Sequence, residues 1–461
     1  MAKTFDKLAY KSKDEFLYGY SPNPVKTKNG LVIGGGDVYP EINFTLPPMN
    51  INESTMPEVR KQYTMIINGV LKRAKELHAP GIAVELELLP PMTLNPKWGI
   101  EVHKLVRDAM FEYEAKYGLK SVMRITPNDT REILRPPFLR RGEPWENMLK
   151  TFEGCAKDGA DFLAIESTGG KEIDDDALVN ADLRKVIFSL GVLGVRDMRY
   201  LWGNIVKIAD ETGSIASGDT ACGFGNTAMI LAERGFIPRM FAAVVRTVTV
   251  ERSLVAYEMG AVGPSKDCAY EGPYMKAMAG VPIAMEGKSS ACAHLTSVGN
   301  VSQAVADLWS NESVQNVKLL SDMAPVVSME QLIYDCRLMN EAKNDGHESM
   351  LKLRNWLSDS DSRLDPQAYV LRPDVVYDIS SEIIKEKDAF LRTKKAAEVT
   401  IEKLRNAISN KELKVEKKEE RWLDIMESQL DDIPDDEEKF WNEIKDEIEP
   451  GKFRPEEYGL K

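Results

Sequence analysis

The sequence predicts an α/β fold, namely a (β/α)8 TIM barrel with an added helical region at its carboxyl end. Short apolar segments alternate with helical stretches, as in parallel β/α units. The segments number eight, which is the count that a barrel needs, and long hairpins are nearly absent; a doubly wound open sheet shares the local pattern. The expected strands are 30–34, 81–88, 121–126, 162–166, 214–218, 260–264, 281–286 and 317–322.

Capping signals and apolar stripes mark the helices between these strands. The segment 55–58 forms a capping box with proline in the first turn, and an apolar helical face then runs to Leu77. A second stripe of this kind ends at Gly159, just before a strand expected to be buried on both faces. The valine-rich segment 238–260 leaves helix and strand both open.

Beyond residue 345 the pattern changes to helix without strand, and Lys and Glu become frequent. We therefore divide the chain into an N-terminal extension (1–29), a barrel (30–345) and a helical, charged C-terminal region (346–461). One long amphipathic helix is expected over 376–408, followed by an acidic stretch that contains Phe440 and Trp441. We expect this region to pack on the barrel as a solvated helix; a subunit or partner contact is the alternative.

The composition bounds the compartment and the partners. The 461 residues carry a formal net charge of −13, which disfavours nucleic acid and anionic lipid as partners. No apolar run approaches the ~20 residues of a membrane-spanning helix, and from the charged residues at the start we expect no secretory signal. Five cysteines without a CxxC pair are too sparse for a disulfide framework. These features predict a cytoplasmic protein.

Three residues that follow successive strands could form a metal site. Glu166 directly follows an apolar strand, and Cys222 and Cys268 follow the next two expected strands. In β/α barrels the active site is built at the carboxyl ends of the strands, so these side chains should meet at one rim. Two thiolates and a carboxylate suit zinc and leave a fourth position open for substrate. The sequence therefore predicts a catalytic zinc site.

The other cysteines have simpler explanations. A single cysteine is more often a packed core thiol than a ligand, but the matched placement of the pair above favours ligation. Cys155 and Cys336 lie on apolar helical stripes and are expected in the core. Cys292-Ala293-His294 follows the seventh expected strand and stays the main competitor for a ligand position.

Two glycine-rich segments and several acids complete the candidates. Gly223–Ala228 fits a GxGxxA phosphate loop, but it belongs to the fifth unit instead of the first and is better explained as a turn. The glycines before Asp37 are expected to form a tight turn that brings this residue towards the rim. Glu85, Glu87 and Asp219 are further strand-end acids, either in the pocket or paired with Lys or Arg.

The segments "FLAIESTGG", "GDTACGFGNTAM" and "GPSKDCAYEGPYMKA" resemble the methanol:corrinoid methyltransferases of methanogenic archaea, in their zinc-carrying subunit. The resemblance covers essentially the whole chain. It implies a barrel with one zinc per chain, held by Glu166, Cys222 and Cys268, and methanol as substrate. It also implies transfer of the methyl group to the cob(I)amide of a separate corrinoid protein.

The chain contains no Asp-x-His-x-x-Gly motif with which to hold a corrinoid. Cobalamin should therefore arrive on a partner that docks over the carboxyl rim, in a homodimer or a larger hetero-oligomer. Because hydroxide is a poor leaving group, we expect methanol to keep its proton or to be reprotonated, with Asp219, Glu85 and Glu87 as candidate donors. The alternatives are a zinc methyltransferase or hydrolase with another small substrate, and a docking subunit whose cysteines are core residues.

Overall fold

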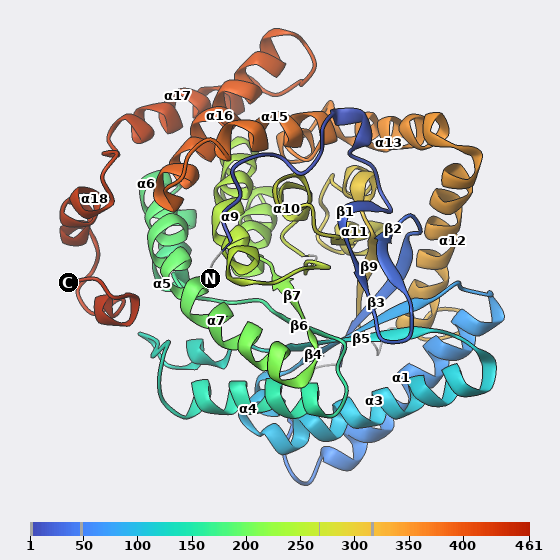
Figure 1. Cartoon of the computed structure of the whole chain (residues 1–461). Coiled ribbons are helices and arrows are strands. Elements are labelled where there is room, and N and C mark those ends of the chain that lie inside the picture. Colours follow the sequence, from blue (N-terminus) through green and yellow to red (C-terminus); the bar gives the residue numbers. More distant parts are fainter. Residues whose placement is uncertain (1–2, 47–48, 267, 315–317) are drawn as a thin grey trace.

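Seven parallel strands curl round a common axis, and helices surround them (Figure 1). The computed structural model describes residues 3–46, 49–266, 268–314 and 318–461. The strand order is β7-β6-β5-β4-β3-β9-β8, so neighbours in the sheet mostly follow one another along the chain. These strands are β3 (Tyr39–Thr45), β4 (Ile82–Leu88), β5 (Ser121–Pro127), β6 (Phe162–Ile165), β7 (Ile215–Asp219), β8 (Ala284–Glu286) and β9 (Leu308–Val314).

An irregular segment joins the two edges of this sheet. The strand expected at 260–264 lies between β7 and β8, where the Val262 amide donates to the Ala216 carbonyl at 2.9 Å. On its other side, Ser265 forms a parallel bridge with Ile283. The segment is not a regular strand because its proline has no N–H to donate. The segment nevertheless fills the gap between β7 and β8, where the eighth strand of a closed barrel would lie. The predicted barrel is therefore confirmed.

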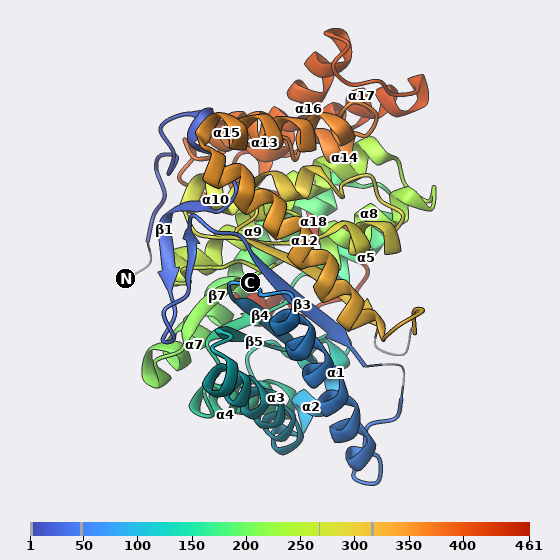
Figure 2. The same cartoon turned by 90° about the vertical axis from the view of Figure 1, so that its right-hand side faces the viewer.

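The first expected strand, 30–34, is wrong as a barrel strand. It falls on β2 (Val32–Gly35), which pairs antiparallel with β1 (Tyr20–Lys26) outside the barrel sheet. Leu31 and Ile33 of this hairpin pack against the first inward side chains of the barrel, including Phe162 and Leu308. The hairpin therefore closes the amino-terminal end of the barrel, and Figure 2 shows it on the side opposite helices α5 (Lys171–Val179) and α8 (Thr227–Glu233).

The last expected strand, 317–322, is wrong as well. The barrel strand is β9, whose centre reads Ser310-Asn311-Glu312 and therefore shows no apolar run. Residue 317 lies outside the described residues, and Lys318 forms an antiparallel bridge with Met323. The other expected strands, 81–88, 121–126, 162–166, 214–218 and 281–286, fall on β4 to β8.

The interior of the barrel is polar towards the carboxyl ends of its strands. Arg124 of β5 donates to Glu41 of β3 at 2.8 Å and to Ser217 of β7 at 3.0 Å, all buried. Asn43 and Glu85 are partners in register on the neighbouring strands β3 and β4, nearer the carboxyl ends. Polar side chains buried in this way need partners, so the barrel holds them as a connected network beneath its rim.

The ambiguous segment 238–260 is the helix α9 (Arg239–Met259), buried along nearly its whole length. It packs against α7 (Val195–Thr212), α16 (Ala389–Ser409) and the π-helix η3 (Phe188–Gly194), so its apolar residues surround the helix instead of forming one stripe. The helices from α1 to α12 include α1 (Met56–Glu76), α2 (Pro90–Leu94), α3 (Pro96–Tyr117), α4 (Glu143–Lys157), α6 (Leu183–Ile187), α7 (Val195–Thr212), α10 (Gly272–Ala279), α11 (Lys288–Ala293) and α12 (Ala324–Asp345).

The C-terminal region is helical, as predicted, but the single helix expected over 376–408 is wrong. Two helices occupy this segment. Asp388 caps the start of the second helix, where its side chain accepts a hydrogen bond from the Leu391 amide. The division of the chain at residue 345 stays a prediction. The helices are α13 (His347–Ser362), α14 (Pro366–Tyr369), α15 (Pro373–Ile383), α16 (Ala389–Ser409), α17 (Lys417–Asp431) and α18 (Glu437–Ile444).

The acidic stretch of the C-terminal region packs on the chain itself. Trp441 stacks on Phe188 of η3 with ring centroids 5.7 Å apart, and Phe440 contacts the same ring. The Tyr458 hydroxyl accepts a hydrogen bond from the Gly170 amide at 2.8 Å, in the loop that follows β6. The end of the chain thus contacts a loop of the carboxyl rim. Among the described helices, none has the length and apolar character needed to cross a bilayer.

Candidate metal centre

The structure brings Glu166, Cys222 and Cys268 together at the carboxyl rim. Glu166 follows β6, Cys222 begins the π-helix η4 (Cys222–Asn226) after β7, and Cys268 follows the irregular eighth segment. One ligand atom from each residue lies within 4.8 Å of the others. The Cys268 sulfur is 3.1 Å from the Glu166 Oε1 atom. Three side chains that are far apart in the sequence therefore converge as the sequence predicts.

A bulge in β7 sets the direction of the loop that carries Cys222. The register of β6 and β7 shifts next to Gly218, whose φ is 156°. A Cβ at this glycine would lie 2.3 Å from the Tyr257 hydroxyl of α9. Only glycine allows the strand to pass so close to the helix, and bulges of this kind redirect the residues that follow.

Thr220 ties the two cysteine loops together. Its hydroxyl accepts a hydrogen bond from the Ala269 amide at 3.0 Å and donates to the Glu271 carboxylate at 3.2 Å. The same carboxylate accepts from the Ala221 amide at 2.8 Å. The residues next to Cys222 and Cys268 are thus fixed relative to each other by buried hydrogen bonds.

Replacing this hydroxyl tests the network. Thr220→Val should lower the free energy of unfolding by about 1–3 kcal/mol, because the buried Ala269 amide and Glu271 carboxylate each lose a partner. Urea unfolding measures the change, and Thr64→Val on the exposed face of α1 is the matched control. Equal stability of the two variants would show that the network does not hold the loops.

The two thiols are strongly biased towards their protonated form when no cation is bound. A hydrogen bond from Cys268 lowers the pKa of Cys222, but burial and the Glu166 and Glu286 carboxylates outweigh it and raise this pKa to about 12. Burial, with the Cys222 thiol beside it, raises the pKa of Cys268 well above its usual value. A bound dication would stabilise the thiolates instead, so the donor set fits a metal such as zinc.

Lys266 is a site residue that the sequence did not reveal. Its Nζ atom lies 2.7 Å from Glu85, 2.7 Å from Glu87 and 3.5 Å from Glu166, and its side chain is fully buried. Lysine is rarely buried, so sequence reasoning expects it at the surface. Its place two residues before Cys268 is the one signal that could have pointed to it.

Glu85 and Glu87 contact Lys266, which also contacts the candidate metal ligand Glu166. Glu85 also accepts a hydrogen bond from the Thr126 hydroxyl at 2.6 Å, and Glu87 accepts from the Asn43 amide at 3.0 Å. The sequence-based alternative of pairing with a lysine is therefore confirmed for both acids, and their place in a substrate pocket stays a prediction. The lysine connects them to Glu166.

Asp219 is connected to the candidate metal centre through Ser167, the residue after Glu166. Its carboxylate accepts hydrogen bonds from the Ser167 hydroxyl at 2.7 Å and from the Trp202 indole at 2.9 Å. Burial raises the pKa of Asp219 above its usual value, although Arg252 and these hydrogen bonds lower it. Since Ser167 directly follows Glu166, the geometry fits a residue that positions the Glu166 loop.

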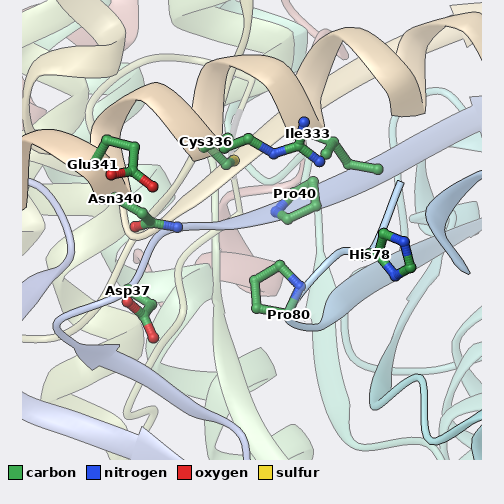
Figure 3. A pocket seen from close by; sticks show the side chains of 9 residues that line it. Asp37, Pro40, His78, Pro80, Ile333, Cys336, Asn340 and Glu341 are labelled. Carbon is green, nitrogen blue, oxygen red and sulfur yellow. The ribbon is translucent and has the colours of Figure 1, made fainter. Parts of the chain in front are cut away.

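Asp37 is not at the carboxyl rim, and the expectation that its turn leads there is wrong. It precedes β3 and so lies at the amino-terminal end, where it forms an ion pair with Lys343 of α12. Figure 3 shows it lining a cavity of about 200 Å³ with Asn340 and Cys336 of α12. The chain enters the barrel through this turn, so the turn cannot reach the opposite end.

The sequence predicts core positions for two of the remaining cysteines, and the structure confirms both. Cys155 and Cys336 are buried in the apolar core, whereas Cys292 is exposed on α11. Neither Cys292 nor His294 belongs to the group around Glu166 among the described residues. The structure assigns His294 to a second group of potential ligands, described below.

The fold and the site define a β/α-barrel enzyme with a candidate thiolate and carboxylate metal centre at its carboxyl rim. The chain matches the methanol-cobalamin methyltransferase B subunit family over residues 2–459 and belongs to it. Membership of this family confirms the predicted activity, which is the transfer of a methyl group from methanol to a corrinoid.

Two relatives cover the whole chain. A methanol–corrinoid protein co-methyltransferase of Methanosarcina barkeri is 38% identical over 466 residues, with 100% of both chains covered. The crystal structure of the methanol:cobalamin methyltransferase complex from Methanosarcina barkeri contains a chain with a TM-score of 0.94 and 38% identity, again with 100% of each chain covered.

Proposed function

We propose that this chain activates methanol at a zinc ion held by Glu166, Cys222 and Cys268, and passes the methyl group to the cob(I)amide of a partner corrinoid protein. The observation that carries the proposal is the convergence of these three ligands within 4.8 Å at the rim of the barrel. Family membership supports the substrate and the acceptor. The cytoplasmic location and the oligomeric state stay predictions.

The donor set favours zinc over harder cations. Two sulfurs suit its borderline-soft character, and three protein ligands leave a position for substrate. When bound, zinc supplies Lewis acidity that stabilises negative charge developing on the methanol oxygen. The three anionic ligands would give the site a net charge of about −1, which limits the acidity of bound methanol and favours retention of its proton.

The neighbouring residues of the chain orient the ligands and hold charge. Lys266 contacts the same Glu166 oxygen that faces Cys268, so it fixes which way that carboxylate points. It also neutralises part of the charge of Glu85 and Glu87, which its ammonium group connects to Glu166. We assign proton supply to these two acids and a positioning role to Asp219.

The substrate assignment is tested by comparing methyl donors. The purified chain is incubated with free cob(I)alamin and either methanol, methylamine or methanethiol, and methylcobalamin is followed by its absorbance. We expect product from methanol alone. Product from methylamine or methanethiol, with none from methanol, would favour the alternative of another small substrate in the same fold.

Zinc binding should release protons. Because the pKa of Cys222 is raised to about 12 and that of Cys268 lies well above its usual value, both thiols carry protons at pH 7 before the metal binds. Zinc binding to the metal-free chain should release about two protons and weaken as the pH falls, since protons compete for the sulfurs. Calorimetry in buffers of different ionisation enthalpy measures this number. A release of no protons would exclude thiolate ligation.

A ring of exposed apolar side chains on the carboxyl rim supports docking of the partner there. Each lies in the stretch of chain that follows a barrel strand, and the parallel topology brings these stretches to the carboxyl rim. Isolated exposed apolar residues are ordinary, but a group on one face marks an interaction surface. The members of this ring are Ile133, Val179, Phe236, Leu295 and Leu320.

Charges placed in this ring should weaken docking. Phe236→Glu and Leu295→Glu replace side chains that are 70% and 80% exposed, so the fold and the zinc content should not change. The dissociation constant for the corrinoid protein should rise about ten-fold or more. Phe111→Glu, on the outer helix α3, is the matched control. Equal affinity of all three variants would place the docking surface elsewhere.

A further inference from the structure

A second group of potential metal ligands lies at the same rim. Glu286 ends β8, His294 follows α11, and Glu312 lies in β9, which is the neighbour of β8 in the sheet. One ligand atom from each residue lies within 4.8 Å of the others. The Nε2 atom of His294 is 3.9 Å from the Oε2 atom of Glu312. The group shares no residue with the three candidate zinc ligands.

Two buried oxygen atoms flank this group without a hydrogen-bond partner among the described residues. They are Asn43 Oδ1 and Ser310 Oγ, on side chains that are 1% and 0% exposed. Asn43 is the register partner of Glu312, and Ser310 is the register partner of Glu286. Partners in a parallel sheet point to the same face, so both oxygens lie on the inner face of the barrel with the two carboxylates. A buried oxygen that has no partner in the protein is available to a bound cation or water.

The chemistry of these donors differs from that of the first group. Carboxylate, imidazole, amide and hydroxyl groups are present and sulfur is absent. Such donors suit hard divalent cations of the Mg²⁺ and Mn²⁺ type, whereas thiolates select zinc. The two carboxylates bring a charge of −2 to a rim that is already acidic, and His294 in its neutral form adds a nitrogen ligand without adding positive charge.

We propose that Glu286, His294 and Glu312 bind a second divalent cation of the Mg²⁺ or Mn²⁺ class, with the oxygens of Asn43 and Ser310 facing it. This site does not depend on the zinc site or on the reaction proposed above. The bound cation would join β8, β9 and the loop after α11, and it would reduce the negative charge that Glu286 exerts beside Cys222 and Cys268.

Manganese is the probe for this site. The chain is stripped of metal, loaded with one equivalent of Zn²⁺ and titrated with Mn²⁺, and the loss of the free Mn²⁺ signal is followed by electron paramagnetic resonance. We expect one saturable Mn²⁺ per chain. His294→Ala and Glu312→Gln should each weaken Mn²⁺ binding at least about ten-fold while the zinc content is retained.

Two control variants separate this site from its surroundings. Cys292→Ala changes an exposed residue of the same segment, and His347→Ala removes an exposed histidine elsewhere; both should bind Mn²⁺ as the unaltered chain does. Cys222→Ala should lose zinc and keep the Mn²⁺ site, which distinguishes failure of one proposal from failure of the other. Absence of saturable Mn²⁺, unchanged binding in Glu312→Gln, or joint loss of zinc and Mn²⁺ in His294→Ala would overturn the inference.

Discussion

Cys268→Ala should lose its zinc and lower the rate of methyl transfer from methanol by about 1,000-fold or more. A Lewis acid contributes several kcal/mol to such a reaction, and each 1.4 kcal/mol corresponds to a factor of ten. The fold should survive, because Cys268 is one small residue in a loop whose backbone is held by Thr220. Cys222→Ala should behave in the same way. Metal analysis and the rate of methylcobalamin formation measure both effects.

The matched controls are the two core cysteines. Cys155→Ala and Cys336→Ala remove thiols that are buried among apolar side chains, so they should cost stability but keep zinc and activity. Retention of one zinc in Cys268→Ala together with its loss in Cys292→Ala would move a ligand position to the exposed thiol of α11. That result would contradict the ligand set proposed above.

Lys266→Met should lower the free energy of unfolding by about 3–5 kcal/mol, because it leaves the buried Glu85 carboxylate without its ammonium partner. The same change frees the Glu166 carboxylate to turn, so zinc affinity should fall as well. Urea unfolding measures the first effect and competition with a chromophoric chelator measures the second.

A surface ion pair provides the control for this variant. Lys104 lies 2.8 Å from Asp108 on α3, with both side chains more than half exposed, so Lys104→Met should change stability by less than about 1 kcal/mol. Lys266→Arg keeps the positive charge and should recover part of the zinc affinity. If Lys266→Met were as stable as Lys104→Met, the buried lysine would not hold the acids of the rim.

The convergence of the candidate ligands could be predicted from the sequence because each follows a segment that is expected to be a strand. Glu166 follows four consecutive apolar residues, and the parallel topology then brings it to the same rim as Cys222 and Cys268. Lys266 could not be predicted in the same way. Its burial depends on acids from β4, and nothing in the local sequence reports a contact across the barrel.

The two wrong assignments of barrel strands have a common physical cause. β9 carries Ser310, Asn311 and Glu312 because it lines the polar interior and the rim, so no apolar run marks it. The segment 30–34 does carry an apolar run, but its side chains cover the end of the barrel. Apolar runs identify strands in contact with helices, whereas strands that line a polar interior are hidden from this criterion.

The central claim is that methanol is activated at a zinc ion held by Glu166, Cys222 and Cys268. The most direct test is to remove zinc from the purified chain with a chelator and add it back in known amounts, while methanol-dependent methylation of cob(I)alamin is measured. The account predicts that activity disappears with the metal and returns in proportion to zinc, up to one ion per chain. Full activity of the zinc-free chain would contradict it.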